Sequence, residues 1–100
     1  METPHALVVE DGFPVSDGHT LVIPRRHVIS LYELASEEQE AVWHVVAGVR
    51  ADLITRLKPD GFNIGINDGS AAGQTIMHAH IHVIPRRCGD VADPRGGSVG

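Results

Sequence analysis

The chain has 100 residues, and its 13 Asp and Glu outnumber its 8 Lys and Arg, so the formal net charge of −5 argues against a surface that coats nucleic acid. This length suits a single small domain over residues 1–100, and no stretch approaches the ~20 consecutive apolar residues of a membrane span. Cys88 is the only cysteine, which excludes an intrachain disulfide and a cysteine-rich zinc site. We therefore expect a cytoplasmic domain whose partners include neither nucleic acid nor a membrane.

The first half of the chain is predicted to hold two strands and one long helix. Residues 6–10 are apolar and β-prone, a Gly-Phe-Pro turn signal follows, and residues 20–23 form a second strand that Pro24 ends. Ser36 and Gln39 have the spacing of a capping box, and valines and leucines then recur at helical intervals. This pattern predicts an amphipathic helix over residues 36–57.

The second half is predicted to hold two more strands, over residues 61–66 and 77–84, joined by a polar loop. Together the elements predict an α+β fold, with an antiparallel β-sheet and one main helix packed on it. From about residue 89 the chain is rich in Gly, Asp and Pro, so we expect a tail that runs over the surface.

Three histidines alternate with apolar residues in the last predicted strand, Ile-Met-His-Ala-His-Ile-His-Val-Ile. Successive side chains of a strand point to opposite faces, so His78, His80 and His82 are expected to share one face. One alternative is a solvent-exposed edge strand, although such a face normally carries Thr, Lys, Glu or Ser. Another is a metal site, but no third ligand lies at a convincing spacing. We favour a reactive face without a metal.

The segment that leads into these histidines, Asn-Asp-Gly-Ser-Ala-Ala-Gly-Gln-Thr, is polar and rich in glycine. Gly69 and Gly73 permit a close approach of the backbone to a ligand, Gln74 offers an amide, and Ser70 and Thr75 offer hydroxyls. Exposed backbone N–H groups in such a turn can face an anion. Next to three histidines, the loop predicts a phosphate site.

Two stretches of the chain resemble the histidine-triad (HIT) superfamily of nucleotide hydrolases and transferases. Gly73-Gln-Thr-Ile-Met-His-Ala-His-Ile-His-Val-Ile-Pro85 is similar to its signature of alternating histidines. Asp17-Gly-His-Thr-Leu-Val-Ile-Pro-Arg-Arg-His-Val28 is similar to an earlier segment of the superfamily. The resemblance covers roughly residues 6–97 and implies a HIT-like fold, a small-molecule nucleotide as substrate, no required cofactor and a homodimer. The predicted helix, with Trp43, is the expected dimer interface.

The resemblance also implies roles for four histidines. His80 matches the nucleophile, whose Nε2 attacks the α-phosphorus and forms a covalent nucleotidyl-imidazole intermediate. His82 matches the residue that contacts the phosphate and the departing group, and we expect it to be protonated when it stabilises the transition state. His78 and His27 match the pair that orients the nucleophile.

Four further residues match positions that bind the substrate. Gln74 and Thr75 match positions that hydrogen-bond the phosphates or the leaving group, and Asn67 matches a polar position of the same pocket. Asp11 matches an Asp or Asn that holds the ribose hydroxyls.

The leading functional hypothesis is a hydrolase of nucleoside phosphoramidates or dinucleoside polyphosphates that acts at the α-phosphate. One alternative is a nucleotide-binding regulatory module with weak or no turnover. A second is a metal-dependent hydrolase, which a chelator would inactivate.

Overall fold

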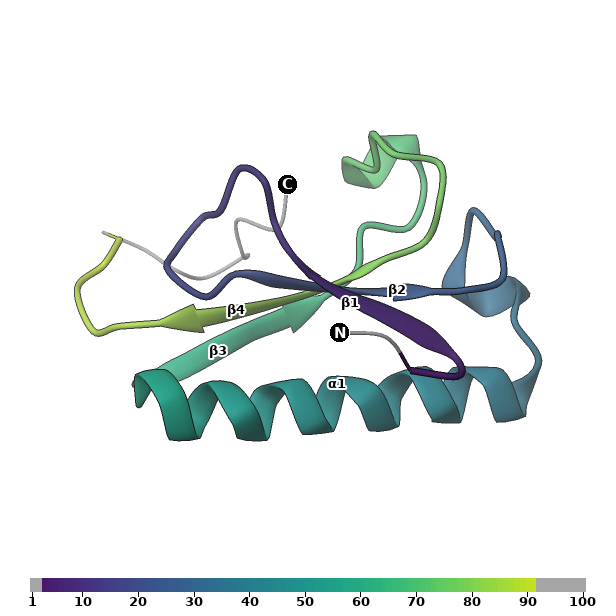
Figure 1. The fold of residues 1–100 in the computed structure, drawn as a ribbon. Coiled ribbons are helices and arrows are strands. Elements are labelled where there is room, and N and C mark those ends of the chain that lie inside the picture. Colours follow the sequence, from purple (N-terminus) through teal and green to yellow (C-terminus); the bar gives the residue numbers. More distant parts are fainter. Residues whose placement is uncertain (1–2, 92–100) are drawn as a thin grey trace.

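One long helix and four strands make up the domain, and a computed structural model describes them within residues 3–91. The elements are β1 (Ala6–Glu10), β2 (Thr20–Pro24), α1 (Ser36–Leu57), β3 (Gly61–Gly65), β4 (Ile81–Arg86) and two short 3₁₀ helices, η1 (Leu31–Glu33) and η2 (Ser70–Ala72). The strands form an antiparallel sheet in the order β1-β2-β4-β3, and α1 packs on one face of it (Figure 1). The predicted α+β fold is confirmed. The predicted tail lies for the most part outside the described residues.

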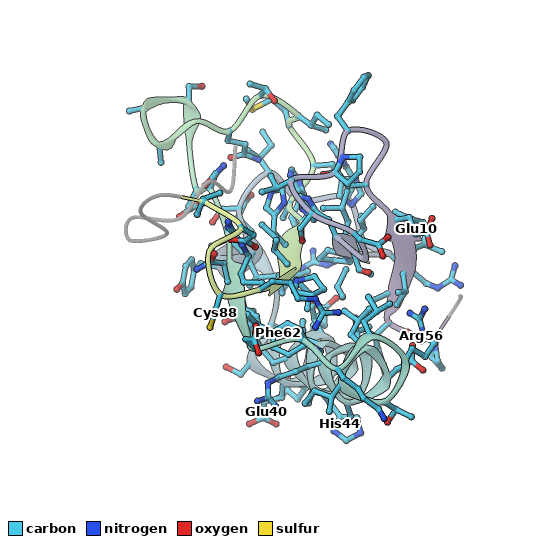
Figure 2. The ribbon with its side chains drawn as sticks, turned by 90° about the vertical axis from the view of Figure 1, so that its left-hand side faces the viewer. Glu10, Glu40, His44, Arg56, Phe62 and Cys88 are labelled. Carbon is cyan, nitrogen blue, oxygen red and sulfur yellow. The ribbon has the colours of Figure 1, made fainter. Side chains whose placement is uncertain are left out.

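The helix α1 provides one side of the hydrophobic core. Its apolar residues recur every three or four positions, so they share one face of the helix. Burying each large apolar side chain contributes about 1.5–3 kcal/mol. The buried residues of α1 are Val42, Val46, Val49 and Leu53, and they form one cluster with Val22, Ile81 and Val83 of the central strands. On the other side of the helix, Glu40 and His44 point away from the sheet (Figure 2). None of the helices within residues 3–91 is both long and apolar enough to span a bilayer.

The first turn of α1 is closed differently from the predicted capping box. Ser36 was expected to cap the helix together with Gln39, but it is the first helical residue. The Glu38 carboxylate instead accepts the N–H of Ala35 at 3.0 Å. Glu38 also accepts a hydrogen bond from Arg26 at 3.1 Å, which ties the segment after β2 to the helix.

The strand β4 begins later than the sequence predicted. The prediction that one strand carries all three histidines on one face is wrong, because β4 begins at Ile81 and only His82 of the three lies on it. The register of β2 and β4, if continued, would place Pro24 opposite Ala79. Proline has no N–H to donate, so the ladder stops there. The N–H of Ala79 donates instead to the carbonyl of Val28 at 2.8 Å.

The sheet face opposite α1 carries the candidate site. Leu21 of β2 and Gly65 of β3 lie directly opposite His82 of β4, so all three residues belong to this face. The β1–β2 and β3–β4 loops both rise on this side of the sheet (Figure 1). In the first loop, Gly18 has a φ of +86°, and a Cβ there would lie 2.4 Å from the Cδ1 atom of Leu57. Glycine therefore allows this turn to pass close to the end of α1.

Candidate functional site

A pocket of about 210 Å³ lies between the β1–β2 loop, the β3–β4 loop and the central strands. Six of the eight residues predicted for the site line this pocket, whereas His27 and His78 do not. The pocket is lined by Asp11, Phe13, Leu21, Asn67, Gly73, Gln74, Thr75, Ile76, His80 and His82.

His80 lies just before β4, and its ring is held by the backbone. Its Nδ1 lies 2.9 Å from the carbonyl oxygen of His78. A carbonyl can only accept a hydrogen bond, so Nδ1 carries the ring proton. In the neutral ring Nε2 then carries the lone pair, which is the tautomer that a nucleophilic imidazole needs. His80 thus lies outside β4, and the backbone carbonyl of His78 fixes the tautomer of its ring.

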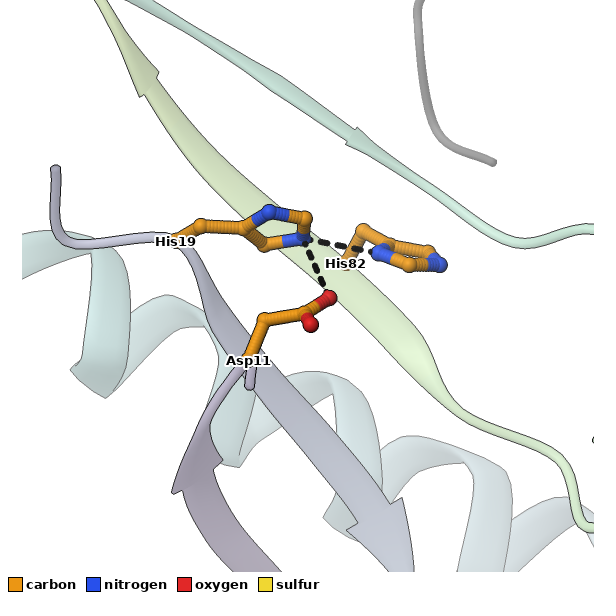
Figure 3. Close-up of side chains that lie close together, drawn as sticks. All are labelled: Asp11, His19 and His82. Atoms are coloured by element: carbon orange, nitrogen blue, oxygen red, sulfur yellow. Dashed lines mark hydrogen bonds and ion pairs between the residues drawn. The ribbon is translucent and has the colours of Figure 1, made fainter. Parts of the chain in front are cut away.

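His82 is 2% exposed, and its tautomer is set by a residue from a distant part of the chain. The backbone N–H of Val15 donates to Nδ1 of His19 at 3.0 Å, so the neutral His19 carries its proton on Nε2. That Nε2 lies 2.9 Å from Nδ1 of His82 (Figure 3). Nδ1 of His82 therefore accepts, and Nε2 of His82 carries the proton. Sequence reasoning assigned no role to His19, although it belongs to the Gly-His motif of the second strand.

Burial determines the charge of His82. It lowers the pKa of His82 to about 4, and the neighbouring His80 and His19 act in the same direction. The ring is therefore neutral at pH 7 in the free protein, whereas the protonated His82 of the sequence analysis is an expectation for the transition state. Its Nε2 is buried and has no hydrogen-bond partner among the described residues. His82 thus offers the pocket a neutral N–H donor.

Asp11 connects the β1–β2 loop to these histidines. One carboxylate oxygen lies 3.4 Å from Nε2 of His19 (Figure 3). The other accepts the N–H of Phe13 at 2.8 Å. Burial lowers the pKa of His19, and the charge of Asp11 opposes this shift. Asp11 therefore lies between the buried histidines and the outer part of the loop.

His78 and His27 form a second pair, outside the pocket lining. Nε2 of His78 donates to the carbonyl of Pro24 at 2.8 Å, so its Nδ1 is the acceptor in the neutral ring. Nδ1 of His27 lies 2.9 Å from Nδ1 of His78 and donates a hydrogen bond to it. Among the contacts of the described residues, one connects this pair to His80, the hydrogen bond between Nδ1 of His80 and the backbone carbonyl of His78.

Gln74 holds the β3–β4 loop in shape. Its Oε1 accepts the N–H of Gly69 at 2.9 Å, and its Nε2 donates to the carbonyls of Ile29 at 2.9 Å and Ile76 at 3.0 Å. Both amide hydrogens are thus engaged within the chain. Gln74 lines the pocket as a buried support of the loop, whereas Thr75 is exposed there.

The donor atoms of Asp11, His19 and His82 lie within 4.8 Å of one another, which is close enough for a shared metal ion. The hydrogen bonding does not fit a metal, because the N–H of Val15 directs the ring proton of His19 to Nε2. That nitrogen is the one that faces the other two groups, and a metal ligand needs its lone pair.

Comparisons with known proteins agree on one family. The HIT domain family model matches residues 1–89. The chain is 40% identical over 85 residues to an uncharacterized HIT-like protein of Mycoplasma genitalium, which covers 85% of this chain and 60% of that protein. It is 38% identical over 81 residues to an adenylylsulfatase of Arabidopsis thaliana, which covers 81% of this chain and 41% of that protein.

A solved structure gives the same result. The NitFhit protein of Caenorhabditis elegans superposes with a TM-score of 0.86 at 40% identity, over 92% of this chain and 22% of that chain. The chain spans 60% of the length of the Mycoplasma relative and a smaller share of the other two. The family match over residues 1–89 and the shared fold lead to one conclusion, that the chain belongs to the HIT family.

Proposed function

We propose that this chain hydrolyses nucleoside phosphoramidates or dinucleoside polyphosphates at the α-phosphate, through a covalent nucleotidyl-histidine intermediate on His80. The observation that carries the proposal is the 2.9 Å contact between Nδ1 of His80 and the carbonyl of His78. It leaves the Nε2 lone pair for attack on phosphorus, in a ring that lines the pocket.

The proposed reaction has two displacements at one phosphorus. Attack by Nε2 of His80 forms a P–N bond and breaks the bond to the leaving group, which departs with the electron pair and takes a proton from solvent. Water then attacks the phosphorus, the P–N bond breaks with its electron pair returning to Nε2, and the proton of the water passes to solvent. The products are a nucleoside monophosphate and the free leaving group.

The donors of the pocket suit the charge that develops on the nonbridging oxygens. The buried Nε2–H of His82 is oriented in advance by His19, so it needs little reorganisation when an anion arrives. The Thr75 hydroxyl is a second donor in the lining. The Arabidopsis relative is named an adenylylsulfatase, and an adenylyl group is itself a nucleoside joined to an α-phosphate.

A kinetic panel with adenosine 5′-phosphoramidate, diadenosine triphosphate and diadenosine tetraphosphate tests the proposal. We expect His80→Ala to lower kcat by roughly 10⁴-fold or more on the preferred substrate, because the nucleophile is removed. His44→Ala is the matched control, because His44 is exposed on α1 and should leave kcat unchanged.

Two outcomes would contradict the proposal. Tight nucleotide binding by the wild type without turnover would favour a regulatory module. Loss of activity with a chelator would favour a metal-dependent hydrolase.

We also propose that the chain forms a homodimer through α1. Trp43 and Ile54 are 42% and 40% exposed and lie on one side of α1, about three helical turns apart. Large exposed apolar side chains on one helix suit a subunit interface. Sedimentation should show a dimer that Trp43→Glu dissociates, and a monomeric wild type would refute this assembly.

We place the protein in a reducing cytoplasm, which cell fractionation can check, because its single cysteine, Cys88, is an exposed free thiol.

A further inference from the structure

One short stretch of the β1–β2 loop, residues 15 and 16, holds both the ring and the backbone of His19. The N–H of Val15 donates to Nδ1 of His19 at 3.0 Å, and the N–H of His19 donates to the carbonyl of Ser16 at 3.1 Å. Nε2 of His19 in turn lies 2.9 Å from Nδ1 of His82 (Figure 3). The position of this stretch therefore acts on the His19 ring, and through that ring on His82.

The hydrogen bond between His19 and His82 has two possible arrangements when both rings are neutral. In the first, Nε2 of His19 donates, and the proton of His82 lies on Nε2. In the second, the proton of His19 lies on Nδ1, so Nδ1 of His82 donates and its Nε2 carries a lone pair. The N–H of Val15 can only donate, so it selects the first arrangement, and the Asp11 carboxylate 3.4 Å from Nε2 of His19 favours the same one. An anionic phosphate needs the first arrangement, because a lone pair on Nε2 of His82 would repel it.

Ser16 joins this stretch of the loop to the central strand β4. Its hydroxyl donates to the carbonyl of Pro85 at 2.5 Å. Among the hydrogen bonds of the described residues, this is the one that connects residues 12–17 with a part of the chain outside the β1–β2 loop. Ser16 is half-buried and is not part of the pocket lining, so any effect that it has on the pocket passes through other residues.

We propose that Ser16 is a positioning residue for the proposed reaction. Its bond to Pro85 holds the loop where the N–H of Val15 meets Nδ1 of His19, and the His19 ring then keeps the proton of His82 on Nε2. This inference rests on the proposed function and adds to it a residue that controls the donor of the pocket from outside the pocket.

The packing of the loop agrees with an anchored position. The register of β2 and β4, if continued, would place Gly18 opposite Pro85, and a Cβ on Gly18 would lie 3.2 Å from the Cγ atom of Pro85. The loop therefore passes close to β4 two residues after Ser16. The Thr20 hydroxyl donates to the carbonyl of Gly18 at 2.8 Å, which fixes the end of the loop. The bond from Ser16 fixes its middle, where the N–H of Val15 lies.

The tautomer of His82 in the free protein tests the inference directly. Ser16→Ala removes the hydroxyl and should leave the fold intact, because Ser16 lies in a loop outside the hydrophobic core. The ¹⁵N chemical shifts of His82 should then move from those of a ring with its proton on Nε2 towards those of a mixture of both arrangements. Ser16→Thr should keep the wild-type shifts, since it retains a hydroxyl. Thr55→Ala is the matched control, because it also removes a hydroxyl that donates to a backbone carbonyl, that of Ala51 in α1, and it should leave the shifts unchanged.

Kinetics show whether Ser16 acts through His19. We expect Ser16→Ala to lower kcat by roughly 2- to 10-fold, the range that corresponds to the loss of one hydrogen bond. His19→Phe removes the residue through which Ser16 is proposed to act. Ser16→Ala should therefore have no further effect on kcat when it is combined with His19→Phe.

Two results would overturn the inference. Wild-type ¹⁵N shifts of His82 in Ser16→Ala would show that the hydroxyl does not set the tautomer. A further loss of kcat in the double variant, as large as the loss from Ser16→Ala alone, would show that Ser16 does not act through His19.

The ¹⁵N shifts are measured without substrate, so they do not depend on the reaction. Altered shifts in Ser16→Ala, in a protein with no turnover that depends on His80, would refute the proposed function alone. Unaltered shifts in Ser16→Ala, in a protein whose turnover does depend on His80, would refute the role of Ser16 alone.

Discussion

At the scale of single residues, backbone groups determine which ring nitrogen carries the proton in three histidines, and one of these, His19, sets the tautomer of His82 in turn. The N–H of Val15 acts on His19, the carbonyl of His78 acts on His80, and the carbonyl of Pro24 acts on His78. The result is one ring with a lone pair on Nε2 and one with a proton on Nε2, both lining the pocket. A nucleophile and a hydrogen-bond donor are thus obtained from the same residue type.

His19 provides a test of this arrangement. His19→Phe removes the donor to Nδ1 of His82, so we expect a mixture of His82 tautomers and a kcat lower by roughly 10- to 100-fold. His19→Gln should restore much of the activity, because its amide N–H can donate to the same atom. The ¹⁵N chemical shifts of His82 report the tautomer directly. Unchanged shifts in His19→Phe would show that His19 does not set it.

The sequence identified His80 and His82 but not the importance of His19. The pattern of alternating histidines is local and can be read from neighbouring residues. The contact between His19 and His82 joins residues 63 positions apart, and it exists because Leu21 pairs with His82 in the sheet. Strand register of this kind depends on tertiary packing and is not visible in the motif.

At the scale of elements, periodicity predicted the regular parts of the fold well. The expected bounds of β1 and α1 agree with the structure, because a strand and a long helix each bury one continuous apolar face. The start of β4 was missed, because the strand pattern continues through the histidines while the register brings Pro24 opposite Ala79. The sequence therefore predicted six of the residues that line the pocket, but not the conformation of the segment that carries His78 and His80.

The β3–β4 loop should depend on Gln74 for its shape. Gln74→Ala removes three part-buried hydrogen bonds to the backbone, so we expect the free energy of unfolding to decrease by about 2–3 kcal/mol. Urea denaturation measures this change, and hydrogen exchange at Gly69 should become faster. A matched variant is Ser70→Ala, which changes an exposed residue of the same loop and should have little effect. Equal stabilities of the two variants would contradict this role.

At the scale of the whole molecule, the sheet separates two functions. The face that meets α1 supplies the apolar core, and the opposite face carries buried histidines. The second face imposes a dependence of stability on pH, because a buried neutral imidazole resists protonation.

The sign of this dependence follows from His82. Its pKa is about 4 in the folded protein, and the ordinary histidine pKa of 6.5 applies to the unfolded chain. Between these two pH values the unfolded chain therefore binds more protons than the folded protein. The stability that it contributes is complete above about pH 6.5 and is lost as the pH falls towards 4. We expect a loss of about 2 kcal/mol at pH 5 relative to pH 8 from this residue, and the lowered pKa of His19 adds in the same direction.

Urea denaturation at pH 8 and pH 5 measures the difference in the free energy of unfolding. His82→Asn should reduce that difference, because it removes the buried imidazole. Asp90 should not contribute, since its hydrogen bonds with Arg86 lower its pKa to about 2, below this range. The same pH dependence in wild type and His82→Asn would contradict the assignment.

The central claim, that Nε2 of His80 bonds to phosphorus, can be tested by trapping the intermediate. Wild-type protein is mixed with adenosine 5′-phosphoramidate, or with the dinucleotide that it prefers, quenched in base within the first turnover, and digested for mass spectrometry. We predict an adenylyl group on His80 that forms and decays at rates consistent with turnover, and that is absent in His80→Ala. An adenylyl group on another residue, or turnover with none at any time point, would contradict the account.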